Sequence, residues 1–472
     1  MKLRNILFLL MVCVIATVFP SCIEDGFTTS SSDQPTFSAD TLKMGEIFTQ
    51  ESTPTKRFSV YNHADKNLSI SSITLRDDAE GWFRLNVDGI SGRNFSNVEI
   101  RPKDSIFVFV EATVPANGVP EMVSLNRHLD FVTNGQTRTV VLNAQSRDVI
   151  RLRDVTLTES TSLTAREPYV VYGSLRVPQG ITLTLEPGVT IHMHDKARID
   201  VEGTLISRGT PQANVNLIGE RTGNVAASIP YELMSGQWDG IYFASTSTGN
   251  HLEYTSVRNS SNGLTFEPND APTAAEIINC QIRNTTNYII DASHANLRLT
   301  GCELTDASSG ILHLKGGHHE LSHCTIANYY LFTALGGPAI QFEHIDAETA
   351  DDSGKPMLTA EITNTIIYGN GTELSHGTLD DTGVYLRRCL LRSAGTDDDH
   401  FINCIWDEDP LYYTIRNEYI FDYRLKPESP AIGAADPALN TFGLTEDRYG
   451  QPLHSPADLG AYVFVEPADN NK

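Results

Sequence analysis

The residues best suited to chemistry lie in acidic loops near the C-terminus. One acidic run is Asp397-Asp398-Asp399, followed by His400, and Arg388 and Arg392 precede it closely. Such carboxylates can hold Ca²⁺. A polysaccharide lyase needs a cation to neutralise the uronate carboxylate and a base, such as an arginine, to remove the neighbouring proton. If the chain is an enzyme, these are its candidate catalytic residues, acting as a polysaccharide lyase or glycoside hydrolase with Ca²⁺ as candidate cofactor. The alternative, which we favour, is a set of solvated loops without catalytic residue or cofactor.

A second set of polar residues suits the binding of a sugar chain without catalysis. Its members flank the repeat positions described below and are Tyr254, Arg258, Gln281, Arg283 and Glu303. The repeat spacing places Arg258 in register with Arg283, and Gln281 next to Glu303. Guanidinium, amide and phenol groups can hydrogen-bond sugar hydroxyls, but a single carboxylate is not the pair that glycoside hydrolysis needs. The alternative to a binding face is an ordinary solvated sheet face.

Four histidines in a short stretch are not predicted to form a metal site. They are His313, His318, His319 and His323, on either side of Gly316-Gly317. Zinc requires ligands that converge on one point, whereas His313 and His323 fall on different predicted strands. We expect a turn with surface histidines and no metal.

Three stretches repeat one pattern and indicate the fold that positions these residues. They are IINCQIRN (277–284), LTGCELTD (299–306) and LSHCTIAN (321–328), with a cysteine fourth in each and 22 residues from one cysteine to the next. A unit of this length is too short for two packed helices and lacks a helical period. It suits one coil of a parallel β-helix, in which coils stack about 4.8 Å apart and place like residues above one another.

The stacked positions are predicted to form an internal ladder. Small, weakly polar side chains tolerate such stacking, and asparagines at the next corner can hydrogen-bond along the stack and to turn backbone. One thiol per coil makes a line rather than a metal site. The ladder residues are Thr255, Cys280, Cys302, Cys324, Thr365, Cys389 and Cys404, followed at the corner by Asn259, Asn284, Asp306 and Asn328.

Residues 37–148 alternate apolar and polar side chains in short runs. Ile106-Phe-Val-Phe-Val110 is one such run, and Asn134-Gly135 suits a tight hairpin turn. Period-two alternation with one buried face predicts a β-sandwich. Stretches such as FSVYNHADKNLSISSITL and TNGQTRTVVLNAQ resemble the immunoglobulin-like domains of Bacteroidetes lipoproteins, which implies a spacer domain.

The rest of the chain resembles bacterial right-handed parallel β-helix proteins. The likeness is carried by Gly203-Thr-Leu205 and Trp238-Asp-Gly-Ile-Tyr-Phe243 in the opening coils. At the C-terminal end it is carried by Ser429-Pro-Ala-Ile-Gly433 and Asp458-Leu-Gly-Ala-Tyr462. The resemblance implies a fold and leaves the activity open, because β-helices host many functions.

The N-terminus is typical of a targeting segment. Lys2 and Arg4 precede an apolar run from Ile6 to Phe19, which is shorter than the about 20 residues of a membrane span and fits a secretory signal. Ser21-Cys22 resembles the lipobox of bacterial lipoproteins, which implies that Cys22 is lipidated. Ile23-Glu24-Asp25 resembles the acidic signal that exports some Bacteroidetes lipoproteins to the cell surface, and a polar linker is the alternative.

The predicted fold class is all-β, with an Ig-like β-sandwich followed by a right-handed parallel β-helix, a solenoid of about 10 coils. The predicted segments are a lipoprotein signal peptide at 1–21, a flexible tether at 22–36, the sandwich at 37–148, the β-helix at 150–425 and a C-terminal cap at 426–466.

These features predict a lipoprotein held in the outer membrane by its lipid and exposed at the cell surface. A net charge of −24 and the lack of any Lys/Arg run disfavour nucleic acid as a partner. We expect the β-helix to bind a polysaccharide or a surface protein without catalysis. The alternatives are the lyase or hydrolase described above and a purely structural surface element.

Overall fold

The computed structural model describes residues 26–119, 121–221, 223–226, 228–343, 358–375, 379 and 382–466. The predicted signal peptide and lipidation site at Cys22 lie outside these residues. The chain divides into two compact units, one ending at Asp148 and the other beginning at Val149. Within the described ranges, no helix combines the length and hydropathy that crossing a membrane would need.

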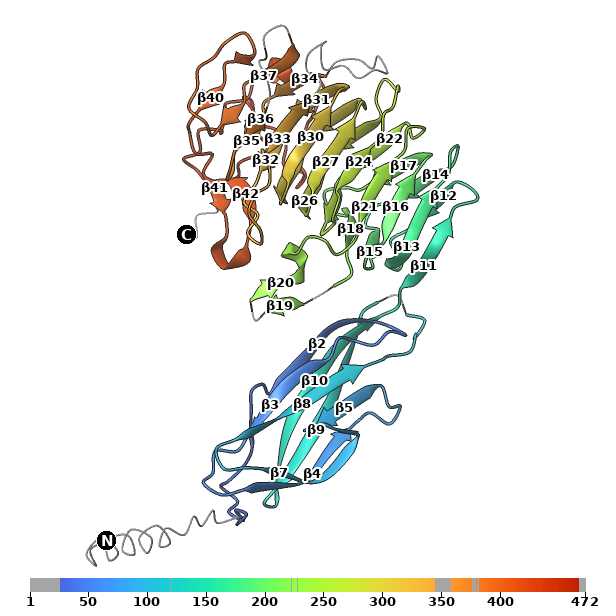
Figure 1. The fold of residues 1–472 in the computed structure, drawn as a ribbon, viewed down its shortest axis with the longest axis vertical. Helices are drawn as coiled ribbons and strands as arrows, with labels where there is room; N and C mark the ends of the chain where they lie inside the picture. The colour runs from blue at the N-terminus through green and yellow to red at the C-terminus, as the bar shows by residue number, and fades with distance from the viewer. Residues whose placement is uncertain are drawn as a thin grey trace, which may run out of the picture. The chain divides into compact units, whose positions relative to one another are not determined.

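The first unit consists of two five-stranded sheets (Figure 1). Its strands are β1 (Thr36–Phe37), β2 (Thr41–Phe48), β3 (Lys56–Tyr61), β4 (Leu68–Arg76), β5 (Phe83–Val87), β6 (Ile90–Gly92), β7 (Asn94–Ile100), β8 (Ser105–Ala112), β9 (Val123–Thr133) and β10 (Gln136–Arg147). The strand orders are β1-β3-β8-β5-β6 and β2-β10-β9-β4-β7, and the first and last long strands, β2 and β10, pair in parallel.

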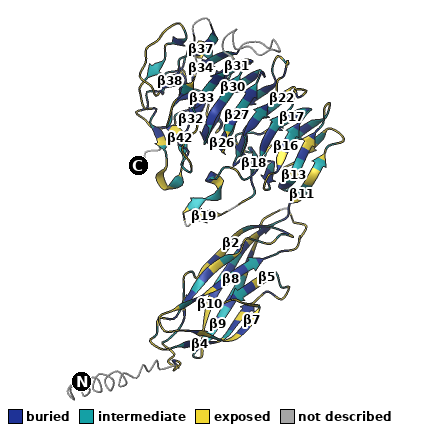
Figure 2. Cartoon of the chain, viewed as in Figure 1, coloured by how far each residue is buried: buried dark blue, intermediate teal, exposed yellow. Residues whose placement is uncertain are grey.

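Alternation along the strands builds the core of this unit. Strand β8 buries every second residue, from Ile106 to Ala112, and Figure 2 shows the same alternation on its neighbours. One hydrophobic cluster joins Val108 of one sheet to Leu129 and Phe131 of the other. The unit is therefore a two-layer β structure, while its Ig-like assignment stays a prediction.

The second unit is built on two long sheets of parallel strands. The ten-stranded sheet contains, in spatial order, β12 (Thr161–Leu163), β14 (Thr182–Leu185), β17 (Thr204–Arg208), β22 (Asn250–Glu253), β25 (Ala275–Ile278), β28 (Leu297–Thr300), β31 (His318–Ser322), β34 (Thr359–Thr363), β37 (Gly383–Arg387) and β39 (Phe401–Ile402). The eighteen-stranded sheet contains β11 (Ile150–Thr156), β13 (Tyr169–Val177), β15 (Thr190–Met193), β16 (Arg198–Val201), β18 (Val215–Gly219), β21 (Gly240–Phe243), β23 (Thr255–Arg258), β24 (Leu264–Phe266), β26 (Gln281–Thr285), β27 (Tyr288–Ser293), β29 (Glu303–Ala307), β30 (Gly310–Lys315), β32 (Thr325–Ala327), β33 (Ile340–Glu343), β35 (Ile366–Ile367), β36 (Leu374–Ser375), β38 (Leu390–Leu391) and β40 (Ile405–Trp406).

Strands of successive repeats pair residue for residue. Ile277 pairs with Leu299, which pairs with Leu321, so the chain forms stacked coils compatible with the predicted β-helix. The handedness of the coils stays a prediction. The coil strands end at Trp406, before the predicted boundary at residue 425, because β41 (Tyr412–Thr414) and β42 (Asp422–Leu425) instead form an antiparallel pair.

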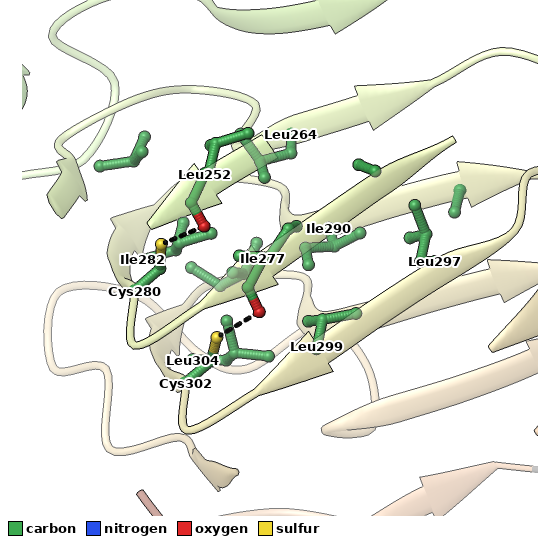
Figure 3. Packing of buried hydrophobic residues seen from close by; sticks show 14 of the residues in the cluster. Leu252, Leu264, Ile277, Cys280, Ile282, Ile290, Leu297, Leu299, Cys302 and Leu304 are labelled. Carbon is green, nitrogen blue, oxygen red and sulfur yellow. Dashed lines mark hydrogen bonds between the residues drawn. The ribbon is translucent and has the colours of Figure 1, made fainter. Parts of the chain in front are cut away.

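Cys280, Cys302, Cys324 and Cys389 are buried on separate coils, and Cys404 is partly buried. Figure 3 shows Cys280 and Cys302 on two successive coils. The Sγ of Cys280 donates a hydrogen bond to the carbonyl of Leu252 at 3.4 Å, and that of Cys302 donates to Ile277 at 3.3 Å. Cys389 likewise bonds to Ile362 on the coil before it, at 3.4 Å. A thiol at this position is therefore small enough to stack and also links adjacent coils.

Each coil turns from one sheet to the other at a residue with left-handed backbone. This residue stands directly before the ladder position, and its φ is 50° at Asn279, 65° at Gly301 and 50° at His323. Left-handed φ is easiest for Gly and Asn, so the histidine is held there by the surrounding stack.

The corner asparagines satisfy backbone groups. Asn328 donates from Nδ2 to the carbonyl of Ala307 on the preceding coil at 2.8 Å. Asn259 and Asn284 both donate to the carbonyl of Glu232, at 2.7 and 2.8 Å. That carbonyl belongs to an inserted segment containing β19 (Asn224–Ala226), β20 (Ile229–Pro230) and the short 3₁₀ helix η1 (Tyr231–Leu233).

The buried thiols should be chemically inert in the folded protein. Burial raises the pKa of Cys280, Cys302 and Cys389 well above the usual range, which leaves almost no reactive thiolate. In a full chain whose cysteines before residue 26 are replaced by serine, we expect a thiol-specific reagent to modify at most the partly buried Cys404. All five remaining thiols should react after unfolding. Fast reaction of three or more in the native state would contradict the stacked interior.

Candidate functional site

The outward residues of β23, β26, β29 and β32 form two rows along one face of the coils. In coil order the rows are Ser256–Gln281–Glu303–Thr325 and Arg258–Arg283–Thr305. The predicted register is confirmed, with Arg258 beside Arg283 and Gln281 beside Glu303. Neighbouring strands lie about 4.8 Å apart, so the two arginines project side by side.

This face is covered by the C-terminal tail (residues 407–464). Tyr462 donates its phenol proton to Oε2 of Glu303, and the N–H of Ala461 donates to Oγ1 of Thr325 at 3.0 Å. The side chain of Glu303 is only 3% exposed as a result. The expectation of an uncovered face is therefore wrong here, and a ligand-binding role for these residues stays a prediction.

A glycine lets the tail approach the coils closely. Gly460 has φ +87°, and a Cβ there would lie 2.8 Å from both Ile366 Cδ1 and Thr325 Oγ1. Two buried carboxylates, Asp447 and Asp458, accept hydrogen bonds from tail N–H groups and hold its turns. Gly460 and Asp458 belong to the stretch Asp458–Tyr462 that was singled out in the sequence.

A second tail contact fixes Asp306, one of the predicted corner residues. Tyr423 donates to both carboxylate oxygens of Asp306, at 2.7 and 2.8 Å, and the N–H of Tyr329 donates to Oδ1 at 3.0 Å. Burial raises the pKa of Asp306, against the lowering effects of Arg283 and Tyr423. This carboxyl group therefore locks the tail to the coils.

Three arginines gather where the tail meets the two rows. Arg448, from the tail, donates to Oδ1 of Asn214 at 3.1 Å and to Oγ of Ser256 at 3.3 Å. The nearest carboxylate contacts of the other two are long: 3.9 Å from Arg283 Nη1 to Glu303 Oε1, and 3.8 Å from Arg258 Nη1 to Glu232 Oε2. We call Arg258, Arg283 and Arg448 the arginine cluster.

The arginine cluster is electrostatically coupled and short of hydrogen-bond acceptors. Burial lowers the pKa of Arg258, and the charges of Arg283 and Arg448 add to this effect against Glu232. Burial also acts to lower the pKa of Arg283, but Glu303 and Asp306 outweigh it and raise the pKa. Among the described residues, the Nε of all three arginines and Nη1 of Arg448 are buried without an acceptor.

Two other predicted binding residues have structural contacts. Tyr254 is buried with φ 43°, and its phenol donates to Oε1 of Glu446 in the tail at 2.7 Å. Gln281 donates from Nε2 to Oε1 of Glu303 at 3.0 Å. Both therefore help to hold Glu303 and the tail in place.

The tail presents an exposed aromatic patch that the sequence reasoning missed. Tyr413 is 59% exposed and Tyr449 51%. The guanidinium of Arg424 lies 5.8 and 5.6 Å from their ring centroids, and Tyr449 stacks on Tyr462 at 5.6 Å. We call Tyr413, Arg424 and Tyr449 the tail patch. It was missed because the tail was expected to cap an end of the coils.

The candidate catalytic aspartates stabilise turns. The carboxylate of Asp397 accepts the N–H groups of Asn403 and Cys404, at 2.7 and 3.1 Å. Asp398 accepts two further backbone N–H groups, which lower its pKa. Asp399 is exposed.

The basic candidates do not converge on these aspartates. His400 Nδ1 lies 2.8 Å from the carbonyl of Val384, and Arg392 donates to the carbonyl of Gly371 at 2.9 Å. Arg388 occupies a coil corner with φ 53°. No group of three metal-ligating side chains occurs in the part of the chain that the structure describes.

The ten-stranded sheet carries a row of outward charges that the sequence reasoning also missed. Arg298 lies 3.6 Å from a carboxylate oxygen of Glu276 and 3.1 Å from one of Glu320. On later coils, Arg387 pairs with Glu361 at 2.5 Å. Each of these carboxylates is thus paired with a cation. The signal was the 22-residue spacing of Glu276, Arg298 and Glu320.

The four histidines occupy different environments. His313 is paired with Asp291 at 3.0 Å and Glu343 at 3.2 Å, and its pKa is raised mainly by Asp291. Burial lowers the pKa of His319 and His323 to about 4. His318 is exposed.

No protein-family model and no curated protein matches this chain. Among solved structures, a protein of unknown function from Porphyromonas gingivalis W83 is 17% identical over 28% of this chain, with a TM-score of 0.19. This chain spans about half of that protein (51%).

Two glycoside hydrolases are also similar at this low level. The catalytic unit of a GH87 alpha-1,3-glucanase from Streptomyces thermodiastaticus is 11% identical over 74% of this chain and 75% of its own, with a TM-score of 0.19. A family 123 glycoside hydrolase from Clostridium perfringens is 6% identical over 26% and 30%, with a TM-score of 0.18. Likenesses this weak carry no argument about activity.

The Tyr462–Glu303 contact should stabilise the second unit. Tyr462→Phe removes the donor to a buried carboxylate, so we expect the unfolding free energy measured in urea to fall by about 1–3 kcal/mol. Tyr449→Phe is the matched control, because its phenol is half exposed, and it should change stability by less than about 0.5 kcal/mol. Equal effects of the two variants would contradict the docked arrangement of the tail.

Proposed function

We propose that the protein is a lipid-anchored surface lipoprotein whose coil unit binds a glycan without catalysis. In this proposal Cys22 carries the lipid in the outer membrane, residues 22–36 form the tether, and the first unit is an Ig-like spacer. The second unit, a right-handed parallel β-helix, presents the binding surface.

The tail patch is the observation that carries this proposal. Two half-exposed tyrosine rings flank the guanidinium of Arg424 on one segment of the surface. Aromatic rings offer a rigid apolar face with a polar edge, which suits the apolar face of a sugar ring. The guanidinium of Arg424 donates from Nε and Nη2 to Asp422, and its Nη1 can donate to hydroxyl groups. Exposed aromatic residues grouped in this way favour recognition.

The state of the carboxylates favours binding over hydrolysis. A glycosidase needs one carboxyl group to donate a proton and a second to act as base or nucleophile. Glu303 and Asp306 are buried beneath tail tyrosines, and the carboxylates on the ten-stranded sheet are ion-paired. The described carboxylates with assigned partners are thus committed to holding the fold.

Removing a ring from the tail patch should weaken glycan binding. In affinity electrophoresis against a panel of neutral and acidic polysaccharides, we expect Tyr449→Ala or Tyr413→Ala to bind the retained glycan about tenfold more weakly. Phe107→Ala is the matched control, because Phe107 is also exposed beneath an arginine, with Arg57 4.8 Å from its ring, but lies in the first unit.

Two results would count against the proposal. One is equal retention of the patch variants and the control. The other is the appearance of new reducing ends or unsaturated products during incubation, which would indicate an enzyme.

A further inference from the structure

In-register stacking places two like charges side by side. Arg258 and Arg283 are direct partners on β23 and β26, and like charges in that position repel. Arg448 of the tail adds a third guanidinium that acts on Arg258. Such an arrangement is stable only if negative charge or acceptor atoms offset it.

The carboxylates nearby stabilise the charge of Arg283, whose pKa Glu303 and Asp306 raise, but they supply no close hydrogen-bond acceptor to the cluster. Glu303 is hydrogen-bonded by Tyr462 and Gln281, and Asp306 by Tyr423. Glu303 and Glu232 approach the cluster only to 3.9 and 3.8 Å, distances too long for hydrogen bonds. Glu232 itself is 64% exposed.

The arginine cluster contains several donors that lack an acceptor. The Nε atoms of Arg258, Arg283 and Arg448, and Nη1 of Arg448, are buried without an acceptor among the described residues, although buried donors are nearly always satisfied. Arg448 is 6% exposed, whereas the side chain of Arg258 is 26% exposed. The cluster is thus enclosed on the side of Arg448 and open to solvent on the side of Arg258.

The arginine cluster adjoins the tail patch. Tyr449 stacks on Tyr462, and the charge of Arg448 acts on the phenol of Tyr449. A glycan that extends from Tyr449 to the open side of the cluster, at Arg258, would bring a charged substituent close to these arginines. Guanidinium groups bind the oxygens of carboxylates and of tetrahedral oxyanions through paired hydrogen bonds.

We propose that the arginine cluster binds an oxyanion substituent of the glycan, a uronate carboxylate or a sulfate ester. The glycan part of this inference rests on the proposed function, whereas the oxyanion site can be tested without it. The protein would then select acidic over neutral glycans, even though its net charge of −24 opposes anion binding at long range.

The test compares variants of the full chain by calorimetry at fixed ionic strength. Its probes are an oligogalacturonide, a sulfated oligosaccharide and a neutral oligosaccharide. Arg258→Gln should lower the affinity for the two acidic oligosaccharides at least tenfold and leave the affinity for the neutral oligosaccharide unchanged. Arg387→Gln, which removes an ion-paired arginine on the other sheet, should change neither.

A second variant moves affinity in the opposite direction and does not threaten folding. Glu232→Gln removes an exposed carboxylate beside Arg258, so it should strengthen binding of the acidic ligand severalfold. Whichever acidic probe binds more tightly, the oligogalacturonide or the sulfated oligosaccharide, identifies the substituent of the glycan that the cluster recognises. Unchanged affinity in both Arg258→Gln and Glu232→Gln would overturn the inference.

Separate outcomes distinguish this inference from the proposed function. If neutral and acidic oligosaccharides bind equally, the oxyanion inference fails and glycan binding stands. If no oligosaccharide binds, the proposed function fails. The oxyanion site is then judged by melting temperature in sulfate or free galacturonate against chloride, where stabilisation of wild type but not Arg258→Gln supports it and no difference overturns it.

Discussion

In-register pairing of successive coils is the constraint on which the rest of the structure depends. Because Ile277, Leu299 and Leu321 align along one sheet, any residue type repeated at a fixed spacing is stacked on itself. Inside the coils this favours small groups such as the thiols of Cys280 and Cys302, which bond to the preceding coil. On the outer faces, in-register pairing places like charges side by side unless acidic and basic residues alternate along the row or another segment supplies opposite charges.

The two outer faces solve this problem differently. On the ten-stranded sheet, Arg298 stands between Glu276 and Glu320 and pairs with both, and Glu361, the next acid in register, is paired with Arg387. On the rows of β23 and β26, Arg258 and Arg283 are in register, and the covering tail adds a third guanidinium, that of Arg448. The retention of three guanidinium groups with unused donors is the physical basis for assigning this place to a ligand.

The coils could be predicted because one residue pattern repeats along the sequence. The surroundings of the arginine cluster could not be predicted, because they depend on contacts between residues far apart in the sequence. The spacing of Cys280, Cys302 and Cys324 fixes strand register and the neighbours of each outward residue, including Arg258 and Arg283. The repeat pattern contains no signal for the hydrogen bond from Tyr462 to Glu303, because these residues are 159 positions apart in the sequence. The tail stretches were recognised by resemblance, yet their place on the lateral face depends on side-chain fit at Gly460. Left-handed backbone at His323 was equally hidden, because the stack rather than the residue's own preference imposes it.

The central claim is that stacked arginines beneath the tail form a place for an oxyanion. Anomalous diffraction from crystals of the full chain soaked in selenate tests it most directly, because selenate mimics sulfate and its selenium can be located without bias. The account predicts a selenium peak within about 4 Å of the guanidinium groups of Arg258 and Arg283, in contact with nitrogens that now lack acceptors. Selenate bound elsewhere on the coils, with none at these arginines, would contradict it.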